Sequence, residues 1–290
     1  MNWVFYALTT AVIFGFQNII TKKILQKEHS VEYLSILYLT SFIFLLPFIK
    51  NVNILSLKII FLVLIRTVLM ATSMLFFIKS LKHMPISTVT PLGNLIPFFS
   101  LIFGFVLLNE VIGIFQIIGV FVLIFGSYIL STEGHIKKAH EPLKKLFSSK
   151  YMFFILMYTL FMALVAIMSK IILNRGISSL DLLFYHNGFS SIIFIGITFI
   201  VYDGMKDLKE GYSIAGMWIV IIAIFGTLGA YTKLLALSDP LGKVSLVIPF
   251  IRLRGLISTV FGGALFHEKY ILHKAIACVL MLVGVGLIVV

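Results

Sequence analysis

The sequence PLGNLIPFFSLIFGFVLLNE at residues 91–110 has a counterpart 158 positions later, PFIRLRGLISTVFGGALFHE at residues 249–268. The match extends over residues 86–130 and 244–288, where eleven of the 45 aligned pairs are identical and many others exchange one apolar residue for another. The identical pairs include Ser87 and Ser245, Pro91 and Pro249, Gly104 and Gly262, Glu110 and Glu268, and Gly126 and Gly284. The chain therefore contains an internal repeat.

Apolar residues dominate the composition of the chain. Of its 290 residues 60% are hydrophobic and 12% are charged, whereas a soluble domain has about 25% charged residues. A helix that crosses a bilayer needs about 20 apolar residues. Ten segments meet this requirement: 3–24, 31–49, 58–79, 86–108, 111–131, 151–174, 181–202, 213–237, 242–266 and 271–290. Near-continuous apolar runs, such as Val111 to Leu130, argue against the alternating pattern of a membrane β-barrel.

Each half of the chain holds five apolar segments, so the second half must cross the membrane in the opposite direction to the first. The longest polar stretch, Ser131 to Lys150, separates the halves. We therefore predict an all-α integral membrane protein with ten transmembrane helices as two inverted five-helix repeats. The repeats are residues 1–131 and 151–290, and residues 132–150 form a basic connecting loop. Inverted repeats are typical of transporters, whose two halves rock around a site at the repeat interface.

The repeated motifs resemble those of a known family. Ser87-x₃-Pro91 is followed by Asn109-Glu110, Gly119 and Gly126, and Ser245-x₃-Pro249 is followed by His267-Glu268 and Gly284. Over essentially its whole length the chain resembles an EamA-type member of the drug/metabolite transporter superfamily. The family usually has Gly-Glu where this chain has Asn109-Glu110 and His267-Glu268. The resemblance implies ten helices, transport of small metabolites and a central cavity lined by helices one, three and four together with six, eight and nine.

Polar residues within the repeated segments predict two opposed cavity walls. Ser87, Pro91 and Asn94 follow the spacing i, i+4, i+7, which places them on one helix face. Their counterparts Ser245, Pro249 and Arg252 share a face of the matching helix. Proline frees a helical carbonyl, which a membrane tolerates where protein or a water-filled cavity satisfies it. The alternative is that both prolines only kink helices for packing.

Basic residues within the apolar segments are further candidates, since charge inside a membrane is costly and commonly functional. Arg252 lies near the membrane midplane, and Arg254 points about 200° away from it on an ideal helix. We therefore expect Arg252 to face the cavity and Arg254 to meet a neighbouring helix or carbonyl. Arg66 fits the cavity and the membrane interface equally well. Lys233, near the end of its segment, is expected to reach the interface.

Weaker candidates are the uncharged polar residues of other segments. Gln17 and Asn18 interrupt an apolar run, and adjacent helical residues point about 100° apart, so one of the two is expected to face the cavity. Tyr231 either lines the cavity or sits at a helix contact. The weakest candidate is His186-Asn187, because a lone histidine usually packs or hydrogen-bonds. Glu110 and Glu268 precede the next helix, whose N-terminus a carboxylate stabilises, so capping explains both.

Several classes of function lack support in the sequence. No apolar segment has Asp or Glu near its centre, and the Gly-x-x-x-x-Gly-Lys-Ser/Thr sequence that cradles nucleotide phosphates is absent. We expect neither an enzyme nor a cofactor or metal site, and Cys278 is the only cysteine. The net charge of +12 falls mostly in loops, so it is attributed to membrane orientation rather than to nucleic-acid binding.

The sequence thus predicts a secondary transporter of a small organic metabolite that works by alternating access. Cationic and amide groups without a buried acid favour a solute with a carboxylate or phosphate, such as an amino acid. The alternatives are an exporter of drugs or hydrophobic metabolites and a non-transporting membrane protein. The expected partners are the solute and membrane lipid, in a cell membrane or alternatively an organelle membrane. The oligomeric state, the coupling ion and the direction of transport stay open.

Overall fold

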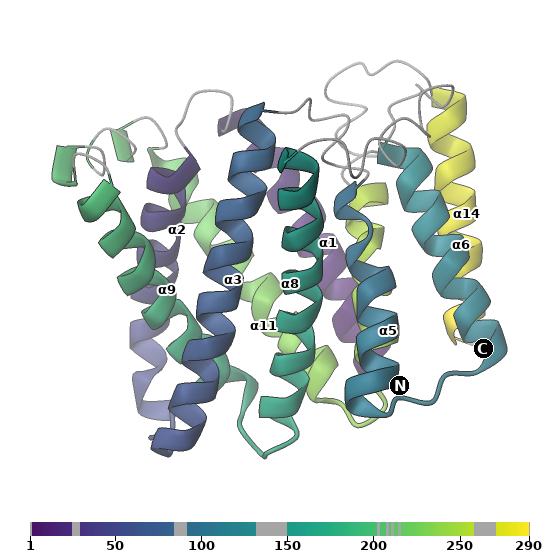
Figure 1. The fold of residues 1–290 in the computed structure, drawn as a ribbon, viewed down its shortest axis with the longest axis horizontal. Helices are drawn as coiled ribbons and strands as arrows, with labels where there is room; N and C mark the ends of the chain where they lie inside the picture. The colour runs from purple at the N-terminus through teal and green to yellow at the C-terminus, as the bar shows by residue number, and fades with distance from the viewer. Residues whose placement is uncertain are drawn as a thin grey trace.

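The computed structural model describes residues 2–24, 30–83, 92–131, 150–201, 204–206, 209, 212–213, 216–257 and 271–289. Every element of these ranges is a helix, and the helices stand side by side as a bundle (Figure 1). Helices suit apolar segments of this kind because a membrane offers no water to backbone N–H and C=O groups, which must therefore bond within the segment.

The helix bounds follow the predicted segments closely. The first half contains α1 (Asn2–Ile24), α2 (Ser30–Leu45) with the 3₁₀ helix η1 (Leu46–Asn51), α3 (Leu57–His83), α5 (Ile96–Leu108) and α6 (Ile114–Ser131). The second half contains α8 (Lys150–Leu173), α9 (Ser179–Val201), α11 (Met217–Ser238), α12 (Val244–Phe250) with the 3₁₀ helix η3 (Ile251–Leu253), and α14 (Ile271–Val289). Each of the ten predicted segments overlaps at least one of these helices.

Five stretches within the described residues are long and apolar enough to cross a membrane: Tyr33–Asn51, Leu57–Phe77, Lys150–Leu173, Ser179–Val201 and Met217–Ser238. Shorter apolar helices occur at Ile96–Leu108, Ile114–Ile129 and Ile276–Val289. The described part of the chain therefore has the helices of a multi-pass membrane protein.

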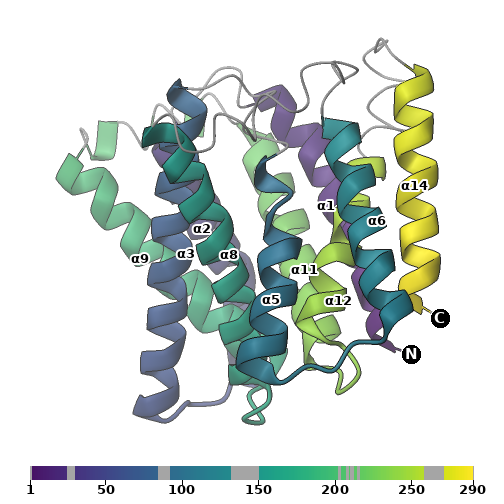
Figure 2. The same cartoon turned by 45° about the vertical axis from the view of Figure 1, so that its right-hand side comes forward.

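The helices pair across the two halves of the chain in a regular way. α1 packs on α11 and α3 packs on α8, while α2 pairs with α9, α5 with α12, and α6 with α14. The repeat makes α8 the counterpart of α1 and α11 the counterpart of α3. Replacing every helix by its counterpart turns the pair α1–α11 into α8–α3 and gives the same set of pairs. α1 starts at the lower end of the bundle and α8 at the upper end, and the two termini lie at the same end (Figures 1 and 2). The halves thus run in opposite directions.

The two repeated segments are each interrupted at the same position. A turn at Asn94 and Leu95 separates the helical residues 92–93 from α5. In the second half, η3 (Ile251–Leu253) replaces regular α-helix after Pro249. The repeat offset of 158 positions places Asn94 opposite Arg252. Each of the two segments was expected to be one regular helix, and the described residues instead contain a turn in the first and a 3₁₀ stretch in the second.

Glycines bring α6 and α14 into close contact. A Cβ atom on Gly119 would lie 2.7 Å from the carbonyl oxygen of Gly284, and one on Gly284 would lie 2.7 Å from the backbone nitrogen of Leu123. A Cβ on Gly126 would similarly meet Met281 at 2.9 Å. Small residues permit this approach of helix backbones within a membrane. The matched glycines Gly126 and Gly284 therefore belong to the packing of this pair.

Candidate functional site: a cationic central cavity

A cavity of about 320 Å³ lies between the two halves of the bundle. Helices of both halves line it, and their lining residues are Phe14, Gln17, Leu37, Tyr38, Ser41, Arg66, Met70, Met74, Ile96, Tyr158, Met162, Val165, Ala166, His186, Asn187, Gly226, Thr227, Ala230, Lys233, Ile248, Ile251, Arg252 and Arg254. Most of them lie along one face of each helix. On α3, for example, Arg66, Met70 and Met74 recur at intervals of four residues, the spacing of one helix face.

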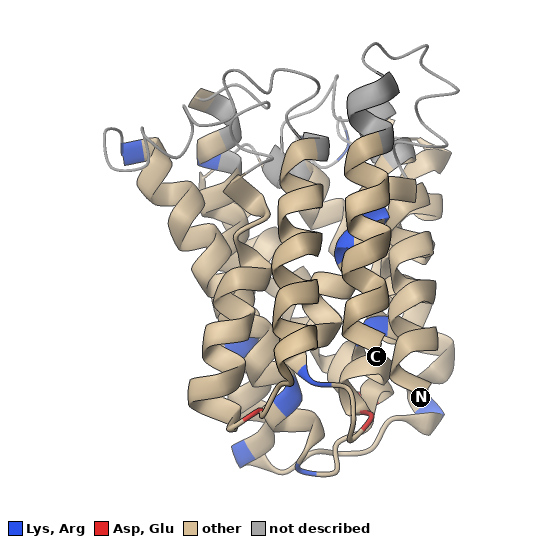
Figure 3. Ribbon diagram, turned by 90° about the vertical axis from the view of Figure 1, so that its right-hand side faces the viewer, with Lys and Arg blue, Asp and Glu red and all other residues tan. Residues whose placement is uncertain are grey.

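Four cationic side chains face this cavity: Arg66 of α3, Lys233 of α11, and Arg252 and Arg254 of the segment after α12. No Asp or Glu belongs to its described lining. Viewed from the side, Lys and Arg positions occur within the height of the bundle, whereas the visible acidic positions lie near its lower end (Figure 3). Unbalanced positive charge away from water is costly and attracts an anion.

The guanidinium of Arg66 has a hydrogen-bond donor without an acceptor among the described residues. Its side chain is 3% exposed, and its Nε donates to Oγ of Ser169 at 2.8 Å. Its Nη1 has no hydrogen-bond partner among the described residues, and neither has the buried Oγ1 of Thr227, across the cavity on α11. Buried polar groups are normally paired, so both atoms are placed to bond a ligand in the cavity.

Arg252 is held by the broken helix of the other half. Its Nη2 donates to the carbonyl oxygen of Gly93 at 3.2 Å. Pro97, four residues after Gly93, lies in the first turn of α5 and has no N–H to offer that carbonyl. The proline therefore leaves free an acceptor that the arginine takes. The acceptor that the structure gives for Arg252 thus lies in the other half of the chain.

Arg254 also lines the cavity, although it was expected to point away from Arg252 and to meet a neighbouring helix or carbonyl. That expectation assumed a regular α-helix, on which residues two positions apart point about 160° apart by the shorter way round. η3 has three residues per turn, which reduces this separation to about 120°. Arg252 and Arg254 can therefore both reach one cavity.

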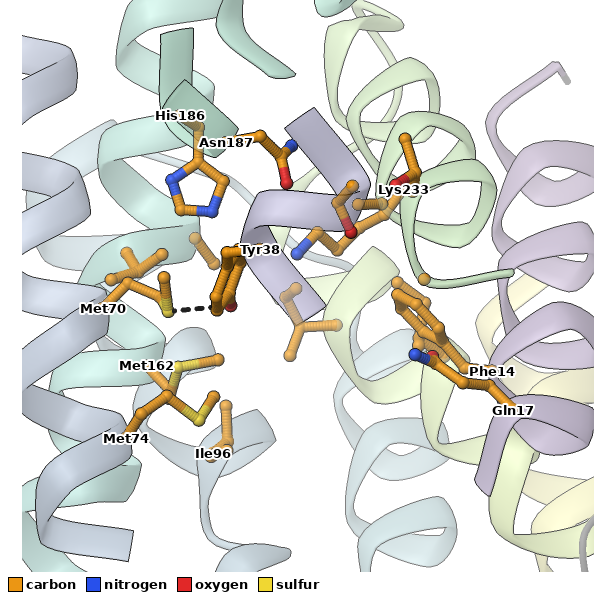
Figure 4. A pocket seen from close by; sticks show the side chains of 18 of the residues that line it. Phe14, Gln17, Tyr38, Met70, Met74, Ile96, Met162, His186, Asn187 and Lys233 are labelled. Carbon is orange, nitrogen blue, oxygen red and sulfur yellow. Dashed lines mark hydrogen bonds between the residues drawn. The ribbon is translucent and has the colours of Figure 1, made fainter. Parts of the chain in front are cut away.

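Other parts of the cavity wall carry uncharged polar side chains and methionine thioethers (Figure 4). His186 and Asn187 of α9 lie side by side on its wall, and the ring of Tyr38 meets the His186 imidazole edge to face with centroids 6.0 Å apart. The Tyr38 hydroxyl donates to Sδ of Met70 at 3.4 Å. Met70, Met74 and Met162 form an apolar area beside them (Figure 4). The cavity thus offers charge and apolar surface to one ligand.

The polar candidates of α1 and α11 divide between the cavity and other surroundings. Gln17 lines the cavity and Asn18 is exposed on the outside, as expected for neighbours 100° apart. Lys233 points into the cavity instead of reaching the interface, since it continues the α11 face that carries Gly226 and Ala230. Tyr231, two residues before Lys233, lies off that face and packs against the main hydrophobic core.

Most residues of the two predicted polar walls are not placed at the cavity where the structure describes them. Asn94 is buried, but its Nδ2 donates to the carbonyl of Ser127 on α6 at 3.0 Å, because the turn at Asn94 ends the helix face that it was expected to share. Ser245 and Pro249 are buried without lining the cavity. Ser87 and Pro91 lie outside the described residues.

Ser245 is instead bound by Glu110. The Glu110 carboxylate accepts hydrogen bonds from the backbone N–H of Val244 at 2.7 Å, from that of Ser245 at 3.0 Å and from the Ser245 hydroxyl. Glu110 was expected to cap the helix that follows it, and it caps α12 of the other half. Asn109 before it has φ of 52°, a left-handed conformation that Asn and Gly adopt most readily. This explains why Asn can stand in place of the family's glycine.

Sequence reasoning ranked His186 and Asn187 last and did not single out Tyr38, Thr227 or Met162. For His186 and Asn187 the signal was present, since both are polar in the middle of an apolar segment. The other three are common in packed helices, and only the assembled bundle distinguishes their lining positions from ordinary core positions.

Comparisons with known proteins agree with this architecture. The sequence model of the EamA-like transporter family matches residues 1–132 and 149–290. A solved structure described only as "Crystal structure of protein" aligns with 99% of this chain and 96% of its own, with a TM-score of 0.75 and 12% identity. At that identity the likeness shows the fold alone. No curated protein sequence matches the chain.

Proposed function

Because the chain belongs to the EamA-like transporter family of the drug/metabolite transporter superfamily, we propose that it is a secondary transporter of a small organic anion. The solute carries a carboxylate or phosphate group, and amino acids are among the candidates. It binds in the central cavity, where Arg66, Lys233, Arg252 and Arg254 surround its anionic group.

The observation that supports this proposal most directly is the imbalance of charge in the cavity. Four cationic side chains line a space of about 320 Å³, and its described lining contains no acid. An anion that enters would form charge-assisted hydrogen bonds, for which the guanidinium of Arg66 has an unused donor. A cationic drug would meet like charges without compensation.

The transport cycle follows from two inverted five-helix repeats, residues 1–131 and 151–290, joined by the loop at 132–150. Together they make ten membrane-spanning helices, and the cavity lies between the halves. Alternating access then requires the halves to rock about the bound solute, first toward one side of the membrane and then toward the other. The contact of Arg252 with Gly93 joins the two halves at the cavity, so it changes when they move. The cell membrane is the membrane that we propose for this transport.

A second candidate function is export of amphipathic or hydrophobic metabolites. Met70, Met74 and Met162 favour it, because flexible thioether side chains adapt to varied apolar ligands. The two candidates differ in the charge that the ligand must carry.

Both are tested by a thermal-stability screen of the purified protein against small metabolites of each charge. A ligand that binds only the folded state raises the melting temperature. We expect stabilisation by carboxylates or phosphates and none by permanent cations, with uptake of the stabilising solutes into proteoliposomes. Stabilisation by cations alone would overturn the anion proposal.

A further inference from the structure

The wall that α9 contributes to the cavity differs chemically from the cationic walls. His186 and Asn187 lie there on neighbouring positions (Figure 4). Arginine and lysine can only donate hydrogen bonds, whereas a neutral imidazole and an amide each have one accepting group. The orientation of those two acceptors depends on the partners behind them.

The hydrogen bonds of Thr67 assign the proton on His186. Thr67 Oγ1 lies 2.8 Å from the carbonyl oxygen of Val63, to which it donates its single proton. The same oxygen lies 3.1 Å from Nδ1 of His186, so it can only accept there. We therefore assign a proton to Nδ1, where the Oγ of Ser190 at 3.4 Å can also accept it. A neutral His186 is consequently an acceptor at Nε2.

The neutral form of His186 is favoured first by the burial of its ring, which keeps water from a charge there, and then by the positive charge already nearby. Arg66 directly precedes Thr67 on α3, and the charges of Arg66 and Lys233 both act on the imidazole. The other neighbours, Tyr38 and Ser190, bring no negative charge. Adding one more positive charge in this buried position is unfavourable.

Asn187 presents a second acceptor beside Nε2. Its Nδ2 donates to the carbonyl of Leu183 at 2.8 Å, which turns the amide oxygen the other way. In Figure 4 that oxygen points from the α9 wall toward the cavity, on the side of Lys233. Two acceptors therefore adjoin the cationic groups.

We propose that His186 and Asn187 form an acceptor subsite that selects organic anions with a neutral O–H or N–H donor next to the anionic group, such as 2-hydroxy acids. This inference rests on the proposed anion transport. The carboxylate binds Arg66 and Lys233, and the neighbouring hydroxyl donates to Nε2 of His186 or to Oδ1 of Asn187. An ammonium in the same place is disfavoured because Arg66 and Lys233 repel it, so 2-amino acids bind less well than 2-hydroxy acids.

The test uses matched ligands that differ only at the 2-position. Lactate, propionate and alanine form one set, and 2-hydroxy-4-methylpentanoate, 4-methylpentanoate and leucine form a larger one. Binding to the purified full-length protein is measured by calorimetry at neutral pH, where every carboxylate is ionised. We expect the hydroxy acid to bind about fivefold more tightly than the unsubstituted acid, the usual contribution of one hydrogen bond, and the amino acid to bind more weakly than the hydroxy acid.

Two variants assign that preference to the subsite. His186→Phe keeps a planar ring and removes one of the two acceptors, so the preference for the hydroxy acid over the unsubstituted acid should fall, and adding Asn187→Leu should abolish it. Thr67→Val keeps the side-chain shape and removes the group that fixes the proton on Nδ1, so the preference should fall even if the first variant does not fold. Equal binding of the two acids by the natural protein, or tightest binding of the amino acid, would overturn the subsite while leaving anion binding intact. If no carboxylate of either set binds, the proposed function fails together with the subsite.

Discussion

At the residue scale, the environment of Arg252 shows how one side chain connects the two halves. Its guanidinium is always charged, lines the cavity and donates to the Gly93 carbonyl that Pro97 leaves free. A substrate anion can compete for the remaining donors of the same planar group. The arginine is therefore placed to act both in substrate binding and in the contact between repeats.

We predict that Arg252→Ala weakens anion binding about 10- to 100-fold, the usual cost of losing a hydrogen bond to a charged group, and abolishes transport. Arg252→Lys should be impaired too, because an ammonium does not reproduce the planar fork of a guanidinium. The measurement is uptake in proteoliposomes at matched protein level. Arg175→Ala, at an exposed position, serves as the control. Uptake at the natural rate by Arg252→Ala would exclude its role in transport.

At the scale of elements, the pairing of α6 with α14 rests on backbone approach rather than on large side chains. The matched glycines Gly126 and Gly284 both lie at this contact, and Gly119 meets Gly284 directly. Neither helix contributes a residue to the cavity lining. The pair is therefore a structural support outside the site.

We predict that Gly284→Val lowers the melting temperature of the purified protein markedly, since its Cβ would lie 2.7 Å from the Leu123 backbone nitrogen and 2.8 Å from the Gly119 carbonyl oxygen. Backbone atoms cannot yield as a flexible side chain does, and overpacking of this kind costs about 1–3 kcal/mol. Gly286→Val is a matched control two residues away, because nothing lies within 4 Å of its added Cβ. Equal melting temperatures for the two variants would contradict the close backbone contact between α6 and α14.

At the scale of the whole molecule, the orientation in the membrane follows from the distribution of basic residues. Both termini lie at one end of the bundle (Figure 2). Fourteen lysines lie in or beside the loops of the opposite end, five of them among residues 131–150, against five basic residues at the terminal end, and the remaining four of the 23 lie farther inside the apolar segments. The positive-inside rule then places both termini outside the cytoplasm, whereas the family resemblance implies the reverse.

We predict that both termini lie outside the cytoplasm, as the distribution of basic residues favours. A reporter that functions only in the cytoplasm, fused after Val290, should be inactive, and the same reporter inserted in the loop at 132–149 should be active. Activity of the terminal fusion would show instead that the family's orientation holds and that loop charge does not decide it here.

The sequence by itself determined what depends on composition and local periodicity. Apolar segments of sufficient length predicted the helices, and the repeat with an odd number of segments predicted two halves of opposite direction. Local signals also identified Arg252, Arg66 and Gln17 as polar residues in apolar helices. The physical reason is that the cost of burying polar backbone groups and charges acts on each segment separately. The sequence of one segment therefore predicts its structure without knowledge of the helices that pack against it.

Only the tertiary structure decided which polar residues share a space. The turn at Asn94 and the 3₁₀ segment at Ile251–Leu253 redirect side chains that an ideal helix would point elsewhere, turning Asn94 toward α6 and bringing Arg254 to the cavity. Ser245 is bound by a carboxylate 135 positions away, Arg252 by a carbonyl 159 positions away. Such contacts join residues that are far apart in the sequence, and their geometry depends on how whole helices pack. Position along one helix therefore predicts depth in the membrane, while facing partners are fixed only by the assembled bundle.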